Sequence, residues 1–469
     1  MTKTQLAVIG AGPGGYVAAF KAADLGLDVT LIDPDPKPGG VCLYRGCIPS
    51  KALLHVCKLL NEAREAEAWG ISFGEPEIDL KRLRDFKDRV VARMSGGLGQ
   101  LVRARKVNFI RGRARFVDGG TLSVDTDSEE GLQLQFEKAI VATGSRPTTL
   151  PVFDAGGDRV MDSTGALELS EVPARLLVVG GGAIGVELGS VYASLGSAVS
   201  VVEMMPGLVP PADRDLVKPL HDRLEELCER IMVDTTVSSV REEEEALRVA
   251  FQPRDGEPFE ESYDKLLAAV GRTPNSDGLG LENTGATVDG RGCIEVDHQR
   301  RTGEPSIFAI GDVTGSGLAH SASHEGAVAA EVIAGRRVAF EPNAIPNIVY
   351  TDPEIAWCGV TEEEAASDGL DVEITRFPWG ASGRATTQDR NDGLTKLILD
   401  RPGGRVLGVG VAGAGAGELI AEGVLAVEMA ALASDLSHSI HPHPTLSETL
   451  MEAAELFGGH SPHLAPGKR

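Results

Sequence analysis

The order of apolar and polar positions along the chain predicts one supersecondary unit twice. In its first copy, an apolar strand over 5–9 leads into a glycine-rich turn, a helix of apolar periodicity follows over 16–25, and a strand over 28–32 ends at Asp33. The turn contains Gly10, Gly12, Gly14 and Gly15. This order and spacing are typical of a βαβ unit that binds a dinucleotide.

The second copy lies in the middle of the chain. A strand over 176–179, a helix over 186–195 and a strand over 198–202 follow in the same order, and Glu203 is the terminal acid. Its turn contains Gly180, Gly182, Ala183, Ile184 and Gly185. A single glycine pattern of this kind is weak evidence, but two in full βαβ context are strong. We therefore predict that the chain binds two dinucleotides.

The acid of the second unit indicates which dinucleotide it prefers. In such units the glycine N–H groups approach a pyrophosphate at the helix N-terminus, and the acid accepts a hydrogen bond from a ribose hydroxyl. Glu203 would repel a 2′-phosphate, and no arginine follows it before Arg214. The second unit is therefore predicted to bind NAD rather than NADP.

Other patterns divide the rest of the chain. Three apolar strands over 138–144, 266–271 and 306–311 end at glycines, the edge at which doubly wound sheets bind ligands, so the middle unit is predicted to be inserted into the first domain. From about residue 345, strands and turns precede amphipathic helices, which predicts an α+β domain with its helices on one side of a sheet. The strands are expected over 349–357, 394–399 and 406–411, and the helices over 417–432 and 445–456.

Composition and charge narrow the class of partner. The chain has 469 residues, of which 42% are hydrophobic and only 4% aromatic, so about three domains with ample core are expected and base stacking is not. The net charge of −24 repels nucleic-acid phosphates and anionic membrane surfaces, and would attract a basic partner. The alternative is that the acidity only serves solubility, as in a salty cytoplasm.

The apolar segments, the N-terminus and the number of cysteines together indicate a cytoplasmic protein. The longest apolar candidate for a membrane span is interrupted by Glu422 and Glu428, and the N-terminus lacks the cleavage pattern of a signal peptide. Six cysteines are too few for a secreted disulfide scaffold. Four of them are scattered and are expected to be small buried hydrophobes, namely Cys57, Cys228, Cys293 and Cys358.

The other two cysteines, Cys42 and Cys47, lie five residues apart at the start of an expected helix. In an ideal helix, Cα atoms at this spacing are too distant for a disulfide, so a bridge requires a distorted turn, which Gly40 and Gly46 allow. A strained bridge at a helix N-terminus is easily reduced, which indicates a redox-active disulfide. The alternatives, two free buried thiols or an incomplete metal site, explain neither the glycines nor the position of the pair.

These motifs together resemble the FAD-dependent pyridine nucleotide-disulfide oxidoreductases over essentially the whole chain. The resemblance rests on the cysteine segment 39–51, the two glycine turns, Ala-Thr-Gly-Ser at 142–145, Gly-Arg-Thr-Pro-Asn at 271–275 and Ala-Ile-Gly-Asp at 309–312. Segments 353–357, 377–384 and 441–448 are similar to the dihydrolipoamide-oxidising branch of that family.

The resemblance implies an α/β fold of four segments. They are an FAD-binding domain over 1–148, an inserted NAD-binding domain over 149–272, a return to the FAD-binding and central part over 273–344, and an α+β dimerisation domain over 345–469. Both dinucleotide-binding domains would be Rossmann-like.

The resemblance also implies roles for the residues around the cysteines. Cys42 would exchange with lipoamide and Cys47 would contact the flavin, with Lys51 near flavin N5 and paired with Glu187. A dithiol must lose a proton before it attacks a disulfide, and His443, between two prolines and five residues before Glu448, suits this base. The family pattern places this His–Glu pair opposite the disulfide of the other subunit. His441 is expected to be structural, and a His-x-His sequence without further ligands predicts no metal site.

For the cofactors, the resemblance implies that Asp312 binds the FAD ribityl chain and that Leu318, Ala319 and His320 lie near its ring system. The remaining expected cofactor contacts are Gly40, Val41, Cys42, Lys51, Ala114, Thr143, Gly144, Ser145, Glu187, Val237, Gly271, Arg272 and Gly311. Two departures stand out, since Gly317 replaces a common Met, and Tyr44 and Arg45 replace the commoner Asn-Val. The added cation could favour a thiolate and raise the disulfide potential, or it could point to solvent.

We therefore expect a homodimer that oxidises protein-bound dihydrolipoamide with FAD and NAD+. With the first glycine turn beginning at Gly10, the lipoyl group is expected on a separate carrier: the arm of a 2-oxoacid dehydrogenase complex, a glycine-cleavage carrier or one of sulfur oxidation. A basic binding segment of a complex core would suit the acidic surface. The alternatives are another flavin-dependent disulfide reductase, an NAD(P)H:acceptor oxidoreductase and a flavin-bearing structural subunit.

Overall fold

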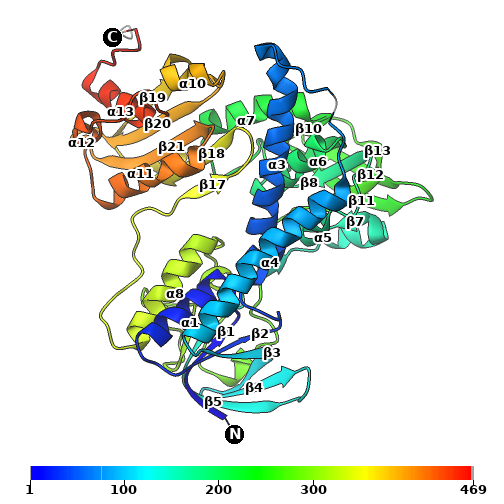
Figure 1. Ribbon diagram of the computed structural model, residues 1–469, viewed down its shortest axis with the longest axis vertical. Coiled ribbons are helices and arrows are strands. Elements are labelled where there is room, and N and C mark those ends of the chain that lie inside the picture. Colours follow the sequence, from blue (N-terminus) through cyan, green and yellow to red (C-terminus); the bar gives the residue numbers. More distant parts are fainter. Residues whose placement is uncertain (1, 75, 466–469) are drawn as a thin grey trace.

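The fold is described by a computed structural model for residues 2–74 and 76–465. The expected first domain begins at Met1 and the expected last domain ends at residue 469. Met1 and residues 466–469 lie outside the described residues. Figure 1 shows three bodies, with the first sheet near the N-terminus, a second at the middle of the sequence and a third near the C-terminus. Among the described residues, no helix combines the length and the apolar character needed to cross a membrane.

The first sheet combines a parallel part with an antiparallel extension. Strand β1 pairs in parallel with both β2 and β5, β2 pairs with β3, and β16 pairs with β5, while β4 joins β3 and β5 antiparallel. The strands are β1 (Thr2–Ile9), β2 (Val29–Asp33), β3 (Asn108–Asp118), β4 (Thr121–Thr126), β5 (Leu132–Val141) and β16 (Ile307–Ala309). This sheet brings together strands from both sides of the middle unit.

The second sheet is parallel throughout, in the order β10-β9-β8-β14-β7. It consists of β7 (Val160–Met161), β8 (Arg175–Val179), β9 (Ala198–Val202), β10 (Arg230–Met232) and β14 (Lys265–Ala268), with an antiparallel sheet of β11 (Thr235–Glu242), β12 (Leu247–Pro253) and β13 (Phe259–Tyr263) beside it. The chain enters and leaves through the antiparallel pair β6 (Ser145–Pro147) and β15 (Arg272–Pro274). The predicted insertion of the middle unit is thus confirmed.

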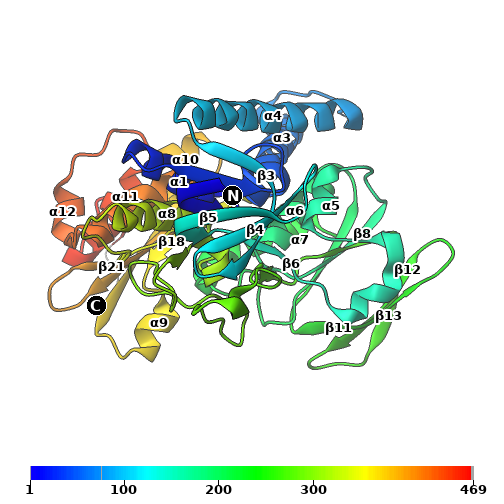
Figure 2. The ribbon, with the colours of Figure 1, turned by 90° about the horizontal axis from the view of Figure 1, so that it is seen from below.

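Helices cover both sheets. In the first unit α1 (Pro13–Asp24) packs against α8 (Ala319–Ile333), and the contact is so close that a Cβ at Gly326 would lie 2.5 Å from the carbonyl oxygen of Gly14. The others that bear on the site are α2 (Gly40–Arg45), α3 (Cys47–Glu65), α4 (Leu80–Ala104), α5 (Ser163–Glu168), α6 (Ala183–Ser194) and α7 (Arg214–Leu227). Figure 2 shows α3 and α4 on one side of the molecule, away from β11–β13.

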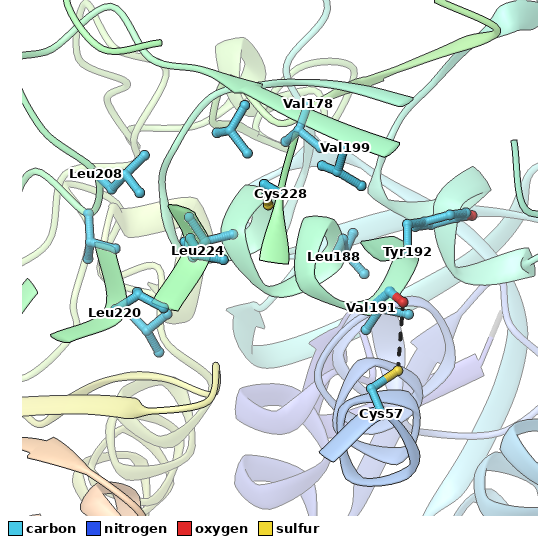
Figure 3. Packing of buried hydrophobic residues seen from close by; sticks show 14 of the residues in the cluster. Cys57, Val178, Leu188, Val191, Tyr192, Val199, Leu208, Leu220, Leu224 and Cys228 are labelled. Carbon is cyan, nitrogen blue, oxygen red and sulfur yellow. Dashed lines mark hydrogen bonds between the residues drawn. The ribbon is translucent and has the colours of Figure 1, made fainter. Parts of the chain in front are cut away.

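The core of the middle unit reaches into its neighbours. Figure 3 shows Leu188 and Tyr192 of α6 and Leu220 and Leu224 of α7 around the sheet, with Cys57 of α3 donating to the carbonyl oxygen of Val191. The four scattered cysteines are all buried, as predicted. Burial raises the pKa of the Cys57 thiol to about 12, so this group stays protonated and behaves as a small hydrophobe.

The C-terminal domain is an antiparallel sheet in the order β17-β18-β21-β20-β19. Its elements are β17 (Asn347–Val349), β18 (Glu354–Gly359), α9 (Glu362–Ser367), β19 (Val372–Pro378), α10 (Gly383–Thr387), β20 (Leu394–Asp400), β21 (Val406–Gly413), α11 (Ala416–Glu428), α12 (Ala433–His438) and α13 (Glu448–Glu455). The strand expected over 349–357 is two strands separated by a turn. The helix expected to reach 432 ends at Glu428, because Ala430 has a positive φ of 51°.

The two faces of this sheet have different partners. Val409 and Val411 of β21 cluster with Ile420 of α11, whereas a Cβ at Gly410 would lie 2.4 Å from Leu216 of α7. Because successive strand residues point to opposite faces, α11 covers one face and α7 of the middle unit covers the other. The prediction that helices of this domain cover one face of its sheet is confirmed for α11. The other face is covered by α7, which belongs to the middle unit.

Candidate functional site

A cavity of about 1550 Å³ connects the two glycine turns. The three glycines that follow β5, β14 and β16, namely Gly144, Gly271 and Gly311, all line it, so the edge at which ligands were expected to bind lies at the cavity. Every residue expected to be catalytic or to contact a cofactor lines this cavity except Gly15, Gly185, His443 and Glu448.

Gly15 and Gly185 lie behind the cavity rather than in its wall. A Cβ at Gly15 would lie 1.8 Å from the carbonyl oxygen of Gly10, and one at Gly185 would lie 1.9 Å from that of Gly180. No larger residue fits, so these glycines allow the helix to pack on the strand. In contrast, the N-cap residues Gly12 and Gly182 have open space beside them and carry no capping side chain, so the helix N–H groups remain available to a pyrophosphate.

The two acids occupy equivalent positions. The carboxylate of Asp33 accepts hydrogen bonds from the N–H of Ala11 at 2.6 Å and of Asp35 at 2.8 Å, and burial raises its pKa. The carboxylate of Glu203 accepts from the N–H of Gly181 at 2.7 Å and of Met205 at 2.8 Å. Each acid therefore fixes its glycine turn and, since a carboxylate oxygen has two acceptor positions, can still bind a ribose hydroxyl.

The first arginine after Glu203 is turned away from the cavity. The guanidinium of Arg214 donates to the carbonyl oxygens of Leu208 at 2.8 Å and Val209 at 2.7 Å, and Arg214 does not line the cavity. It is therefore not placed to bind a 2′-phosphate, in agreement with a site for NAD.

The cysteine pair spans a break between two helices. Cys42 lies in α2 and Cys47 begins α3, and Gly46 between them has φ −148° and ψ −115°. Gly40 has a positive φ of 58°, and a Cβ there would lie 2.5 Å from the Cα of Gly12, so α2 presses directly on the first glycine turn. The distorted turn expected from the glycines is present.

Both cysteines are free thiols in this structure, so the predicted disulfide stays a prediction. The hydrogen bond that joins the two sulfur atoms, together with the nearby ammonium of Lys51, lowers the pKa of Cys47 below its usual value. The same bond and burial raise the pKa of Cys42. Cys47 is therefore the more easily ionised of the two sulfur atoms.

Lys51 and Glu187 meet from different domains, as expected. Lys51 Nζ lies 2.7 Å from Glu187 Oε2, and Glu187 Oε1 accepts from the N–H of Tyr350 at 2.9 Å. Lys51 Nζ also lies 4.5 Å from the centre of the Tyr350 ring. This position of Tyr350 was not expected, because residues 349–357 were predicted to form one strand, whereas Tyr350 lies between β17 and β18.

A second network of polar side chains surrounds Asp312, the acid that is expected to bind the FAD ribityl chain. Arg272 donates to the hydroxyl of Ser145 at 2.7 Å and to its carbonyl oxygen at 2.6 Å, and that hydroxyl donates in turn to Asp312. Glu325, which is fully buried on α8, accepts from the N–H of Gly311 at 2.8 Å. Glu325 was not among the expected site residues, although an acid on the apolar face of a helix could have indicated it.

His443 and Glu448 form a pair at the surface of the C-terminal domain. His443 Nδ1 lies 2.9 Å from Glu448 Oε1, and Glu448 Oε2 accepts from the N–H of Thr445 at 2.7 Å. Burial raises the pKa of the Glu448 carboxyl, but the hydrogen bonds from Thr445 and His443 outweigh this effect, so the pKa lies below its usual value. The His443 side chain is 75% exposed and lies outside the cavity of its own chain.

His441 is built into the domain. Its Nε2 lies 2.8 Å from Glu422 Oε1 of α11, its Nδ1 lies 2.9 Å from the carbonyl oxygen of Ser439, and its side chain is 7% exposed. This geometry supports the structural role expected for it.

Tyr44 and Arg45, the unusual residues between the cysteines, both bond to the segment that follows β2. The guanidinium of Arg45 forms two hydrogen bonds to the Asp35 carboxylate, at 3.1 and 2.7 Å, and the hydroxyl of Tyr44 donates to the carbonyl oxygen of Lys37. Arg45 thus neither faces the thiols as a free cation nor points only to solvent, because its charge is paired. Gly317 lines the cavity with a positive φ of 68°.

Comparisons with known proteins agree with this geometry. Residues 4–326 match the family model "Pyridine nucleotide-disulphide oxidoreductase", and residues 345–454 match the dimerisation domain of the same family. The chain is 48% identical to the dihydrolipoyl dehydrogenase of Vibrio cholerae over 97% of its length and 96% of the relative's. It is 45% identical to that of Halobacterium salinarum over 98% of both chains.

Solved structures show the same fold. LpdA from Mycobacterium tuberculosis superimposes with a TM-score of 0.88 at 28% identity, covering 97% of this chain and 99% of the other. The flavoprotein disulfide reductase RclA from Escherichia coli, which is induced by HOCl, superimposes with a TM-score of 0.84 at 28% identity over 96% and 99%.

Proposed function

Because this chain belongs to the pyridine nucleotide-disulphide oxidoreductase family, we propose that it oxidises the dithiol of a protein-bound dihydrolipoyl group and reduces NAD+. The observation that carries this proposal is the near full-length identity of 45–48% to dihydrolipoyl dehydrogenases, combined with two thiols that open into the cavity between the glycine turns. The chain is a flavoenzyme that uses FAD and NAD, and its C-terminal domain is a dimerisation domain.

The residues of the cavity suit these two cofactors. The first glycine turn, Asp33, Asp312 and the segment 318–320 would hold FAD, and the second turn with Glu203 would hold NAD. When bound, FAD takes up two electrons from a dithiol and NAD+ accepts them as a hydride. We also propose the division into 1–148, 149–272, 273–344 and 345–469 for these domains.

The dithiol exchange uses the chain's own sulfur atoms. In the oxidised enzyme, a substrate thiolate attacks the Cys42 sulfur of a Cys42–Cys47 disulfide, forming a mixed disulfide and releasing Cys47 as a thiolate. The second substrate thiolate then attacks the substrate sulfur that is bonded to Cys42, and Cys42 leaves as a thiolate. The substrate is released as a disulfide, and both enzyme cysteines are reduced. The low pKa of Cys47 makes it the better leaving group in the first step.

His443 accepts the protons that the substrate thiols lose, and Glu448 fixes the ring through Nδ1 so that Nε2 is free to act. Because this pair lies outside the cavity of its own chain, the proposal requires that the partner subunit supply it. Exposed apolar side chains of the C-terminal domain would be covered in such a dimer. They are Leu425, Met429, Leu432 and Ile440.

The proposed partner is a lipoyl group on a separate carrier protein, docked by a basic segment that complements the net charge of −24. Such a carrier and NAD+ would both be met in the cytoplasm, where we place the protein.

An anaerobic titration of the purified flavoprotein with dihydrolipoamide tests the proposal. We expect a long-wavelength charge-transfer band to develop with the dithiol and to disappear when NAD+ is added. If the dithiol causes no spectral change while NADH still bleaches the flavin, the substrate is another disulfide and the proposal is wrong.

A further inference from the structure

The loop over 204–213, which joins Glu203 to α7, forms part of the wall of the second dinucleotide site through Met204 and Pro210. The N–H of Val209 donates to the carbonyl oxygen of Gly181 at 2.9 Å, and the N–H of Gly181 donates to Glu203 at 2.7 Å. The loop, the glycine turn and the acid are thus hydrogen-bonded to one another. Val209 has a positive φ of 45°, a costly conformation for a β-branched residue that the surroundings must hold.

Arg214, the first residue of α7, holds this loop. Its guanidinium donates to the carbonyl oxygens of Leu208 at 2.8 Å, Val209 at 2.7 Å and Pro210 at 3.2 Å, and also to that of Ala212. A planar fork with five donors can bind several carbonyl groups at once, which a lysine ammonium cannot do in the same geometry. Leu208 is further anchored in the core shared with Leu220 and Leu224 of α7 (Figure 3).

The residues on either side of Arg214 attach the loop to the dimerisation domain. Lys396 Nζ on β20 lies 2.6 Å from both Asp213 Oδ2 and Asp215 Oδ1 and 2.7 Å from Glu362 Oε1, and its side chain is 1% exposed. The N–H of Glu362 donates to Asp213 at 3.1 Å. The three acids thus surround a buried ammonium group, and the cluster joins the start of α7 to α9 and β20.

These contacts form a continuous chain from β20 through Asp213 and Arg214 to the loop, the second glycine turn and Glu203. We propose that Lys396, Asp213 and Arg214 are positioning residues for the adenosine half of NAD+, through which the dimerisation domain holds the loop over 204–213 in its binding geometry. This inference rests on the proposed function, since it takes the second glycine turn and Glu203 as the NAD+ site.

Binding of ADP-ribose to the holoenzyme, measured by calorimetry, tests this without turnover, because ADP-ribose carries the adenosine half of NAD+. The variants are Arg214→Lys, which keeps the charge but loses the fork, and Asp213→Asn, which keeps the shape but loses the charge. For both we expect Kd for ADP-ribose and KM for NAD+ to rise about tenfold, the scale of lost charge-assisted hydrogen bonds. FAD content, KM for dihydrolipoamide and kcat at saturating NAD+ should change less than about twofold.

Lys218→Gln is the matched control, because Lys218 lies one turn further along α7 and its ammonium bonds the exposed Asp222. It should leave Kd unchanged. A double-mutant cycle between Lys396→Met and Arg214→Lys measures whether the two ends of the chain of contacts are coupled. If Lys396→Met does not yield holoenzyme, Asp213→Asn replaces it in the cycle.

The outcomes separate this inference from the proposed function. Unchanged Kd values in Arg214→Lys and Asp213→Asn, or additive effects in the cycle, overturn the positioning role while NAD+ binding stands. A wild-type enzyme that binds no ADP-ribose overturns the NAD+ site itself, and the inference with it.

Discussion

At the scale of single residues, the site depends on how neighbouring groups set the protonation of a few side chains. Cys42 donates to Cys47, Lys51 adds a positive charge nearby, and Glu187 holds that ammonium at 2.7 Å. The pKa of Cys47 is therefore lowered and that of Cys42 raised, so the two sulfur atoms differ in how readily they ionise, as a dithiol relay requires.

The pH dependence of the Cys47 thiolate should reveal the contribution of Lys51. Because the pKa of Cys47 is lowered, its thiolate persists above that pKa and is lost as the pH falls through it. In Lys51→Met the titration midpoint of the charge-transfer band in the reduced enzyme should therefore move to higher pH. Absorbance titration of the anaerobically reduced protein measures this, and Lys58→Met on the outer surface of the same helix should leave the midpoint in place. An unmoved midpoint in Lys51→Met would contradict this account.

A second residue-level prediction concerns the base. Glu448→Gln removes the charged partner of His443 Nδ1, so dihydrolipoamide oxidation should slow by about ten- to a hundredfold, because the imidazole loses its fixed tautomer. NADH oxidation by an artificial acceptor, which needs no dithiol, should be unaffected. Steady-state kinetics with both assays checks this. The matched change Glu422→Gln, at the structural His441 pair, should have little effect on either rate.

At the scale of elements, the close approach of α2 to the first glycine turn links the exchange cysteine to cofactor binding. Gly40 sits at the contact, with a positive φ and no room for a side chain, since its Cβ would lie 2.5 Å from the Cα of Gly12. A larger residue must push α2 and the turn apart.

Gly40→Ala should therefore lower the free energy of unfolding by about 1–3 kcal/mol and reduce the fraction of protein that retains FAD. Thermal unfolding and flavin absorbance after gel filtration measure the two effects. Gly97→Ala in α4, where a Cβ meets nothing and the backbone is helical, should instead stabilise the protein by about 0.5–1 kcal/mol. Full flavin retention in Gly40→Ala would show that the contact is not needed.

At the scale of the whole molecule, three bodies supply parts of one reaction path. The FAD-binding unit provides the cysteines, the middle unit provides Glu187 and Glu203, and the C-terminal domain provides Tyr350 and the His443–Glu448 pair. His443 lies outside its own cavity, so the proposed reaction is completed only by a second subunit.

Mixed dimers test this requirement directly. Cys42→Ser and His443→Gln homodimers should each lack dihydrolipoamide oxidation, whereas dimers with one subunit of each type contain one intact site and should regain about half of the wild-type rate per dimer. Co-expression with two affinity tags yields such dimers for the assay.

Met429→Glu should weaken the dimer and this activity together without loss of flavin, and the control Val288→Glu should not.

Much of this organisation could be predicted from sequence. The two βαβ units, the insertion of one into the other and the pairing of Lys51 with Glu187 were all expected, because glycine turns and apolar periodicity are local patterns and the resemblance supplied the pairing. The boundaries were less certain, since one strand was expected to run through Asp352 and Pro353, which form a turn, and the end of α11 depends on the positive φ of Ala430.

The sequence by itself thus determined the two dinucleotide-binding units, their order and the helix break at the cysteine pair, because each depends on residues close together along the chain. Only the tertiary structure decided the contacts between distant segments. It brought Tyr350 beside Lys51 and Glu187, paired Arg45 with Asp35, and enclosed Lys396 among three acids. Such contacts follow from how whole domains pack, and no local pattern of apolar and polar positions encodes that packing.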